Sequence, residues 1–221
     1  MIIKNLIFKE GKSILYVSLA LICLGMFFSY YLSFAGLVLL FFGLYFFRNP
    51  DRSCPEILKN NKDNNFAVCP SDGIVVGIKD LEENNIIHDE RIAKKISIFL
   101  SPLDVHVQWA PISGKIIKKK YSEGKFMFAF VEKSSDLNER NDILLQDVLD
   151  RKMVVRQIAG TIARVIVCWA DEGDHIESGF KYGMIKFGSR IDVFVPKDFE
   201  FNVSVGQRVY GGKTILGRWI C

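Results

Sequence analysis

Three histidines are the first residues to consider for acid–base chemistry, because an imidazole changes its charge near neutral pH. His106 lies in LSPLDVHVQWAP, on an apolar segment that follows a proline turn. A histidine in such a place either satisfies a buried backbone group or serves as a catalytic acid or base, and both interpretations stay open. His88 lies in the polar stretch NNIIHDE and is expected to be solvated, and His175 lies in EGDHIESG, where a role in a turn is favoured.

Asp72 and the pair Gly188 and Ser189 are the other candidates for chemistry. Asp72 opens an expected strand in CPSDGIVVGI, but Asp followed by Gly is also common in turns. Gly188 and Ser189 lie between two segments with the composition of strands, 184–187 and 191–195. A glycine within a strand usually marks a bulge or a close backbone approach. Taken singly, none of these residues identifies an enzyme.

The N-terminal part of the 221-residue chain is apolar, and residues 13–47 contain no charged side chain. A single helix over this segment would be about 50 Å long, well beyond a hydrocarbon core of about 30 Å. A polar pause at residues 29–31 divides the segment into two apolar runs, 14–28 and 32–47. Basic residues precede the first run and follow the second, which predicts a transmembrane helical hairpin with both ends on the cytoplasmic side. The pattern differs from a cleavable signal peptide, because no small-residue cleavage site follows a single short apolar core.

The charges of the remaining chain exclude a nucleic-acid-binding domain. Without residues 1–47, 26 basic and 24 acidic residues remain, a formal balance of +2. This is not the basic footprint that nucleic acid requires. The lysine run 118–120 is interpreted as a solvated strand edge, with contact to anionic lipid as the alternative on a membrane-tethered domain.

The cysteines predict reduced thiols in a cytoplasmic domain and no metal site, because they are odd in number and scattered, without a C-x-x-C pair or a histidine at metal-ligand spacing. The five are Cys23, Cys54, Cys69, Cys168 and Cys221.

Beyond the hairpin at residues 1–47, the segment 48–65 is polar and contains prolines and asparagines, which predicts a connection. A β-rich domain is expected over residues 66–221, and two stretches, around 136–148 and 159–168, are ambiguous and permit helices. The predicted fold class is therefore mainly β with minor α, an α+β fold. The expected strands are short segments bounded by turn residues: 73–79, 95–100, 105–109, 114–119 and 151–158.

A weak internal repeat predicts how some of these strands are connected. Segments 110–126, 171–188 and 202–217 each contain an apolar strand, a glycine turn and a second apolar strand. They resemble the hairpins of biotinyl and lipoyl carrier domains, which form flattened β barrels. A lipoyl/biotinyl-like β-hairpin barrel core is therefore expected, although likeness in fold carries no function.

Five motifs, taken in order, resemble the short, membrane-associated form of phosphatidylserine decarboxylase: SDGIVVGI, IFLSPLDVHVQWAP, NER at 138–140, QIAGTIARVIVCW and GMIKFGSRIDVFVP. The resemblance runs through nearly all of residues 45–217, and FFRNPDR after the apolar hairpin also fits that family. The order and spacing of the motifs make the resemblance more specific than any single motif.

The resemblance implies that the chain cleaves its own bond between Gly188 and Ser189. In the family, the serine hydroxyl attacks the preceding carbonyl, the acyl group shifts from nitrogen to oxygen, and elimination leaves a dehydroalanine that hydrolyses to a pyruvoyl group. Glycine at the preceding position leaves that carbonyl open to attack. The expected products are a β chain, 1–188, and an α chain, 189–221, which stay together as a heterodimer.

The pyruvoyl group derived from Ser189 is then the only cofactor that the family implies, without a metal. Its keto group forms a Schiff base with the amine of phosphatidylserine and accepts the electrons that remain when the carboxylate leaves as carbon dioxide. Hydrolysis releases phosphatidylethanolamine.

The resemblance also assigns Asp72 and His106 to the activation of the reactive serine and to proton handling. Longer members of the family carry a second histidine three residues after the one that matches His106, where this chain has Trp109. Either His106 serves both steps or another base does. Arg190, common in the short form, is expected either to bind the substrate carboxylate or phosphate, or to pair with Asp192 on the surface.

The sequence as a whole predicts a phosphatidylserine decarboxylase anchored on the cytoplasmic face of a bacterial membrane, where a tether raises the effective concentration of a lipid substrate. Two alternatives stay open: a pyruvoyl-dependent decarboxylase of another amine-bearing substrate, and a non-enzymatic membrane-tethered adaptor. Either state of association, a single heterodimer or a higher oligomer, fits the sequence.

Four apolar residues either form a lip toward the acyl chains or alternate between the faces of a strand: Phe126, Met127, Phe128 and Phe130.

Overall fold

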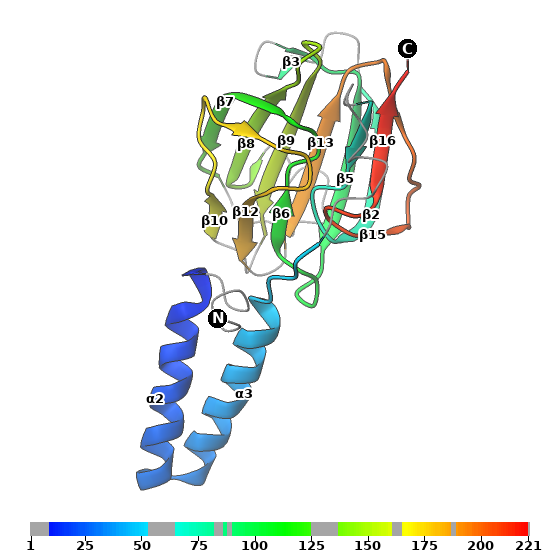
Figure 1. Cartoon of the computed structure of the whole chain (residues 1–221). Helices are drawn as coiled ribbons and strands as arrows, with labels where there is room; N and C mark the ends of the chain where they lie inside the picture. Colours follow the sequence, from blue (N-terminus) through cyan, green and yellow to red (C-terminus); the bar gives the residue numbers. More distant parts are fainter. Residues whose placement is uncertain are drawn as a thin grey trace. The chain divides into compact units, whose positions relative to one another are not determined.

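The computed structural model (Figure 1) describes residues 9–52, 65–81, 86–87, 90–124, 137–160, 165–186 and 189–220. The chain forms two compact units, Met1–Asp51 and Arg52–Cys221. The boundary between the units falls inside the polar connection that the sequence predicts at 48–65.

The first unit contains a pair of packed α-helices, which confirms the helical hairpin expected from the two apolar runs. Glycines allow the two helices to approach closely. A Cβ atom added at Gly25 would lie 2.2 Å from the backbone nitrogen of Ser33, and one added at Gly36 would lie 2.8 Å from the Ile22 side chain. The elements of this unit are η1 (Lys9–Gly11), α2 (Lys12–Phe28) and α3 (Tyr30–Phe46).

Within the described part of the chain, no helix is both long enough and apolar enough to cross a membrane. Helices α2 and α3 have 17 residues each. At 1.5 Å per residue each is about 26 Å long, shorter than a hydrocarbon core of about 30 Å. The structure therefore supports the hairpin but does not support the expectation that it is transmembrane.

The second unit is built on an open, eight-stranded antiparallel sheet. Strand β13 lies near its centre and is paired on both sides, with β9 and with β5. In sheet order the strands are β11 (His175–Ile176), β7 (Gly114–Ser122), β8 (Arg140–Gln146), β9 (Lys152–Ala159), β13 (Ser189–Val195), β5 (Lys94–Leu100), β2 (Gly73–Asp80) and β15 (Arg208–Val209).

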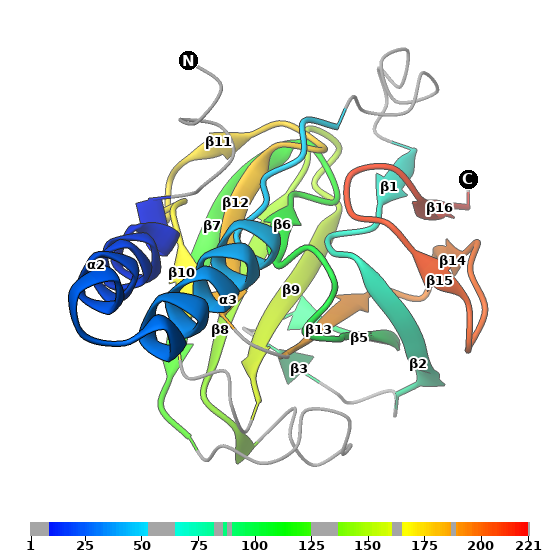
Figure 2. The ribbon, with the colours of Figure 1, turned by 90° about the horizontal axis from the view of Figure 1, so that it is seen from below.

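Two three-stranded sheets cover one face of this large sheet. The first, which contacts β8 and β9, is drawn in front of them in Figure 1, and the second lies toward β5 and β2 in both views (Figures 1 and 2). A two-stranded ladder, β3 (Ile86–Ile87) with β4 (Glu90–Arg91), completes the described strands. The first cover sheet has the order β10 (Val165–Cys168), β12 (Lys181–Lys186), β6 (Val107–Trp109), and the second β1 (Phe66–Val68), β16 (Ile215–Trp219), β14 (Phe199–Phe201).

Successive side chains of β13 point to opposite faces of the large sheet, as in any strand. Ile191, Val193 and Val195 belong to the main apolar core beneath the cover sheets, whereas Phe194 belongs to a smaller cluster on the other face. Ser189 lies two residues before Ile191, so its side chain is on the same face of the sheet and points toward the main core. This alternation decides which neighbours each functional side chain can reach.

The fold class predicted from sequence, mainly β with minor α, is confirmed. The two ambiguous stretches, around 136–148 and 159–168, contain strands β8 and β10 in their described parts. In β8, Ile143 and Leu145 face the main core while Leu144 faces the smaller cluster. A strand buried on both faces has a continuous apolar run without alternation, and such a run is hard to distinguish from a helix.

The expected closed barrel is wrong, because the eight-stranded sheet ends at two different edge strands, β11 and β15. The hairpin-like repeats do not pair into one continuous cylinder. Strand β7 belongs to the large sheet, whereas β12 and β16 belong to the two cover sheets. The core is filled by sheets packed face to face, so closure of the large sheet is not needed to bury its apolar side.

Gly217 and Gly77 form a matched pair of strand glycines for testing this packing. A Cβ atom at Gly217 would lie 2.2 Å from the Glu200 carbonyl oxygen and 2.5 Å from the Phe199 ring, whereas one at Gly77 would meet nothing within 4 Å. We expect Gly217→Ala to destabilise the protein by about 1–3 kcal/mol through overpacking. Gly77→Ala is the control, and equal melting temperatures for the two variants would contradict the packing of β14 on β16.

Candidate functional site

The residues singled out from sequence meet at one end of the large sheet. In the ladders of β13, Ser189 pairs with Leu100 of β5 and with Ala159 of β9. Asp72 directly precedes β2, whose Ile74 pairs with Phe99 of β5, so it lies at the same end. Neighbouring strands are about 4.8 Å apart, which places the backbones of Ser189 and Asp72, two strands apart, on the order of 10 Å from each other.

Ser189 is the first residue of β13 and is completely buried. Its hydroxyl oxygen has no hydrogen-bond partner among the described residues. Buried polar groups are nearly always paired, so an unpaired one in a native protein points to strain or to a chemical role. Phe187 and Gly188, which precede it, lie outside the described residues.

His106 approaches the same end from the neighbouring cover sheet. Its carbonyl oxygen accepts a hydrogen bond from the Ile185 backbone nitrogen at 3.3 Å, and β12 ends one residue later at Lys186. Only two residues lie between Lys186 and Ser189 in the sequence, so their Cα atoms are at most about 11 Å apart. Figure 1 shows the end of β12 and the start of β13 on the lower side of the domain.

The imidazole of His106 is fully buried, and its Nδ1 atom lies 2.9 Å from the backbone carbonyl oxygen of Asp104. A carbonyl oxygen can only accept, so Nδ1 carries the hydrogen in this contact. In a neutral ring Nε2 then has a lone pair and can take up a proton. The structure thus confirms that His106 satisfies a backbone group, and its role as an acid or base stays a prediction.

Asp104 is a residue of this site that the sequence reasoning missed. Its carboxylate is buried, accepts a hydrogen bond from the Ser101 backbone nitrogen at 2.8 Å, and forms an ion pair with Arg208 of β15. Its position two residues before His106, in SPLDVH, was a signal that could have found it. Nothing in the sequence connects it with Arg208, which lies 104 residues away along the chain.

Asp72 is also buried, and donors contact both of its carboxylate oxygens. Arg52 contacts the two oxygens through its two terminal nitrogens, one of them at 2.8 Å, and the Gly211 backbone nitrogen donates to Oδ1 at 2.9 Å. Arg52 also donates to the Gly211 carbonyl oxygen at 2.7 Å. This two-pronged geometry is the strong form of an arginine–carboxylate pair.

Trp109, at the position of the second family histidine, packs over this ion pair. The guanidinium carbon of Arg52 lies 4.6 Å from the centre of the indole ring. A Cβ atom at Gly211 would lie 2.4 Å from the indole, so only glycine lets that backbone pass. The indole has no group that exchanges a proton near neutral pH, and Trp109 therefore builds the site without acting as a base.

Arg190 points to the opposite face of the sheet from Ser189, since the two are successive residues of β13. Its guanidinium donates to Asp192 at 2.6 and 3.1 Å and to the Ser97 hydroxyl at 2.7 Å. All three side chains are buried. The pair with Asp192 is thus present, but inside the protein and not on its surface. Binding of substrate by Arg190 stays a prediction that these contacts do not favour.

A chain of buried amides crosses the core beside Ser189. Asn141 donates to the Gln157 side-chain oxygen at 2.8 Å, and Gln157 donates to the Gln108 side-chain oxygen at 2.6 Å. The Gln108 amide nitrogen has no partner within the described part of the chain. Gln157 lies two residues before Ala159, which pairs with Ser189, so its side chain is on the same face of the sheet as that of Ser189. The three hydrogen-bonded amides therefore lie on the serine's side of the sheet.

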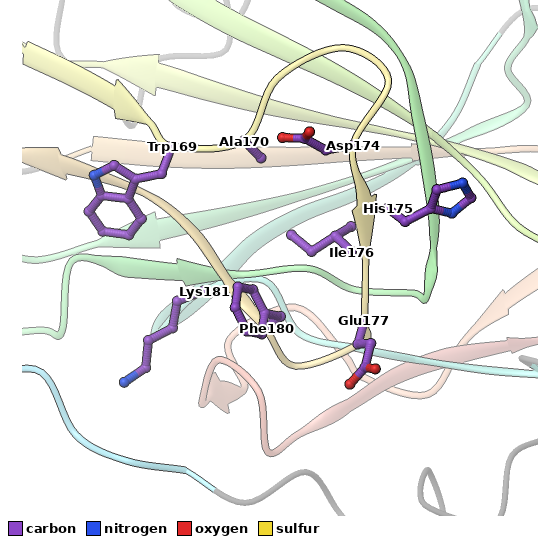
Figure 3. A pocket seen from close by; sticks show the side chains of 8 residues that line it. All are labelled: Trp169, Ala170, Asp174, His175, Ile176, Glu177, Phe180 and Lys181. Carbon is purple, nitrogen blue, oxygen red and sulfur yellow. The ribbon is translucent and has the colours of Figure 1, made fainter.

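Other candidates lie apart from this site or outside the described residues. His175 is exposed, in β11, beside a cavity of about 410 Å³ (Figure 3) lined by residues 169–170, 174–177 and 180–181. In Figure 3 its imidazole points away from the other labelled side chains. His88 and the apolar residues 126–130 lie outside the described part of the chain.

The described cysteines carry free thiols, as the sequence analysis expects. Cys23, Cys69 and Cys168 are free thiols, whereas Cys54 and Cys221 lie outside the described residues. Burial raises the pKa of Cys69 to about 12, so its thiol stays protonated at neutral pH and is no nucleophile. No cluster of potential metal ligands occurs among the residues with a described position.

Comparison with known proteins adds an independent finding. A family model described as "Phosphatidylserine decarboxylase" matches residues 39–217. The chain is 42% identical over 181 residues to the "Phosphatidylserine decarboxylase proenzyme" of Geotalea uraniireducens, covering 82% of this chain and 81% of the relative. It is 40% identical over 211 residues to the protein of the same name from Ehrlichia chaffeensis, covering 95% of this chain and 90% of the relative.

The buried pair between Arg52 and Asp72 can be tested by removing its cation. We expect Arg52→Met to lower the free energy of unfolding by about 3–5 kcal/mol, because it leaves a buried carboxylate without its partner. Arg218→Met is the matched control, since Arg218 and Glu200 are exposed and 3.9 Å apart. Chemical denaturation of both variants measures the difference, and a loss equally small for both would show that Asp72 does not depend on Arg52.

Proposed function

Because this chain belongs to the phosphatidylserine decarboxylase family, we propose that it converts phosphatidylserine to phosphatidylethanolamine and carbon dioxide after cleaving itself between Gly188 and Ser189. The observation that carries the proposal is the Ser189 hydroxyl, which is buried, unpaired among the described residues, and held at the start of β13. A hydroxyl engaged in a stable hydrogen bond would have to give it up before reacting.

In the proposed cleavage, Ser189 Oγ loses its proton and attacks the carbonyl carbon of Gly188. The carbon–nitrogen bond breaks, the nitrogen of Ser189 takes up a proton, and an ester joins the two residues. Loss of the Cα proton of residue 189 then expels the carboxylate of Gly188 and leaves dehydroalanine. Addition of water and release of ammonia give the pyruvoyl end of the small chain.

His106 is the base that this proposal assigns to the first proton transfer. The contact of Nδ1 with the Asp104 carbonyl leaves Nε2 as the atom that accepts a proton, and burial keeps bulk water from competing for it. Because Trp109 stands at the position of the second family histidine, His106 serves both cleavage and the later proton transfers. Asp72 takes part as a proposed partner in the activation of Ser189.

The surroundings of Ser189 suit the pyruvoyl group that the sequence resemblance implies. A pyruvoyl group at this position supplies an electron sink for loss of the substrate carboxylate. The Gln108 amide, unpaired in the described part of the chain, is a donor suited to a carbonyl oxygen on this face. Gln157 and Asn141 fix the orientation of that amide through their own hydrogen bonds.

The enzyme acts on a membrane lipid, and we propose that it does so at the cytoplasmic face. Large apolar side chains of α2 and α3 are exposed, among them Phe27, Phe28, Phe34 and Phe41. An exposed apolar surface of this kind favours contact with an apolar environment. The free thiols among the described cysteines agree with a reducing compartment.

Ser189→Ala is expected to abolish both self-cleavage and decarboxylation, because it removes the attacking oxygen and the precursor of the pyruvoyl group. Mass spectrometry of the purified full-length protein should show a blocked C-terminal fragment of residues 189–221 in the wild type and an intact chain in the variant. An intact wild-type chain with full activity would overturn the proposal, and an intact, inactive wild-type chain would favour the tethered adaptor.

His106→Ala is expected to slow cleavage by about 10²–10⁴-fold, the usual contribution of a positioned acid or base. The rate is measured from the appearance of the small chain with time after synthesis. His175→Ala is the control, because His175 is exposed and lies in β11. Cleavage of His106→Ala at the wild-type rate would remove His106 from the mechanism.

The substrate is tested by offering the enzyme either vesicles that contain phosphatidylserine or free serine dissolved in buffer. We expect release of carbon dioxide with the lipid and none with the free amino acid, together with accumulation of phosphatidylserine in cells that lack the gene. Unchanged lipids in those cells would favour another amine-bearing substrate for the same chemistry.

A further inference from the structure

We propose that Arg208 and Asp104 are positioning residues for His106, and that after cleavage the small chain thereby orients the base of the large chain. The inference rests on the proposed function, because it assigns a purpose to His106 as a base. It concerns residues that do not touch the reacting bond. Arg208 and Asp104 are called the Arg208–Asp104 clamp below.

The clamp joins a buried anion to a partly exposed cation. The Asp104 side chain is 1% exposed and that of Arg208 is 47% exposed. Arg208 lies in β15, where it pairs with Ile74 of β2, at the end of the large sheet that holds Ser189. The clamp therefore ties the segment between β5 and β6 to the edge of the large sheet.

Asp104 transmits this restraint to His106 through its own backbone. Its nitrogen donates to the Ser101 carbonyl oxygen at 2.9 Å, and its carboxylate accepts from the Ser101 nitrogen at 2.8 Å, so the turn is closed twice. The carbonyl oxygen of Asp104 accepts from His106 Nδ1 at 2.9 Å. A hydrogen bond to one ring nitrogen fixes the tautomer and orientation of the imidazole, and with them the atom that accepts a proton.

The proposed cleavage site lies between the two residues of the clamp in the sequence, so cleavage places them in different chains. Asp104 and His106 belong to the large chain, 1–188, whereas Arg208 belongs to the small chain, 189–221. Before cleavage the clamp is a contact within one chain, and afterwards it is a contact between two. The base of the large chain thus depends on a cation of the same small chain that carries the reactive group.

Arg208 can be replaced without opening a core cavity, because nearly half of its side chain is exposed. Its loss leaves the Asp104 carboxylate with the Ser101 nitrogen as a donor but without the cation, which frees the turn to rearrange. Arg218, also in the small chain, provides the matched control, since its side chain is 57% exposed and its pair with Glu200 spans 3.9 Å.

The test compares Arg208→Met, Arg208→Lys and Arg218→Met in the full-length chain. We expect Arg208→Met to slow self-cleavage by about 10-fold or more, the usual effect of losing a residue that orients a functional histidine. Arg208→Lys, which restores the charge but not the planar geometry, should recover at least about a third of the wild-type rate. Arg218→Met should cleave at the wild-type rate. Arg208→Gln replaces Arg208→Met if the latter does not fold.

A spectroscopic measurement separates positioning from a merely structural role. In the uncleaved Ser189→Ala protein, NMR of the imidazole nitrogens should report hydrogen on Nδ1 of His106, and adding Arg208→Met should give a mixture of tautomers. The chain has only three histidines, so His88→Gln and His175→Gln variants assign the signals.

The outcomes distinguish this inference from the proposed function. Wild-type cleavage in Arg208→Met, or an unchanged His106 tautomer, would overturn the clamp while leaving His106 as the base. Full cleavage and decarboxylation in His106→Ala would instead remove the proposed base, whatever Arg208 does. Loss of rate in Arg208→Met with recovery in Arg208→Lys and a shifted tautomer supports the clamp.

Discussion

A serine hydroxyl held inside the protein without a described partner is the feature on which the rest of the site depends. Burial of an unpaired hydroxyl is unfavourable, so the surrounding structure must hold it in place. Ser189 is held by two antiparallel ladders, one with β5 and one with β9. Because β13 is paired on both sides, Ser189 cannot turn its side chain toward solvent unless its backbone leaves the ladders with β5 and β9.

The other buried polar groups show how the protein offsets the cost of burying charge. Among the described residues, five aspartates are buried, and each is paired with an arginine: Asp72, Asp104, Asp142, Asp147 and Asp192. Burial of an unpaired carboxylate would be much more costly than burial of a pair. Arginine suits this task because its planar guanidinium can contact both oxygens of a carboxylate and stays charged.

Several of these contacts would join the two chains that the proposed cleavage at Gly188 and Ser189 produces, here called the large and the small chain. Gly211 of the small chain binds both Asp72 and Arg52 of the large chain, and Arg208 binds Asp104. Strand β13, in the small chain, lies between two strands of the large chain. The proposed cleavage before its first residue would therefore sever the backbone without removing the ladders.

The sequence alone determined the family, the candidate residues Asp72, His106, Gly188 and Ser189, and most strands, because these depend on local order and on short apolar patterns. It left β8 undecided between strand and helix, because a strand buried on both faces lacks alternation. Its prediction of a barrel was wrong, because closure depends on edge strands far apart in the chain. Only the tertiary structure placed Arg190 on the face away from Ser189, joined Arg52 to Asp72, and joined Arg208 to Asp104. The physical reason is that a buried charge is stabilised by a partner in space, and separation along the sequence does not restrict which residue that partner is.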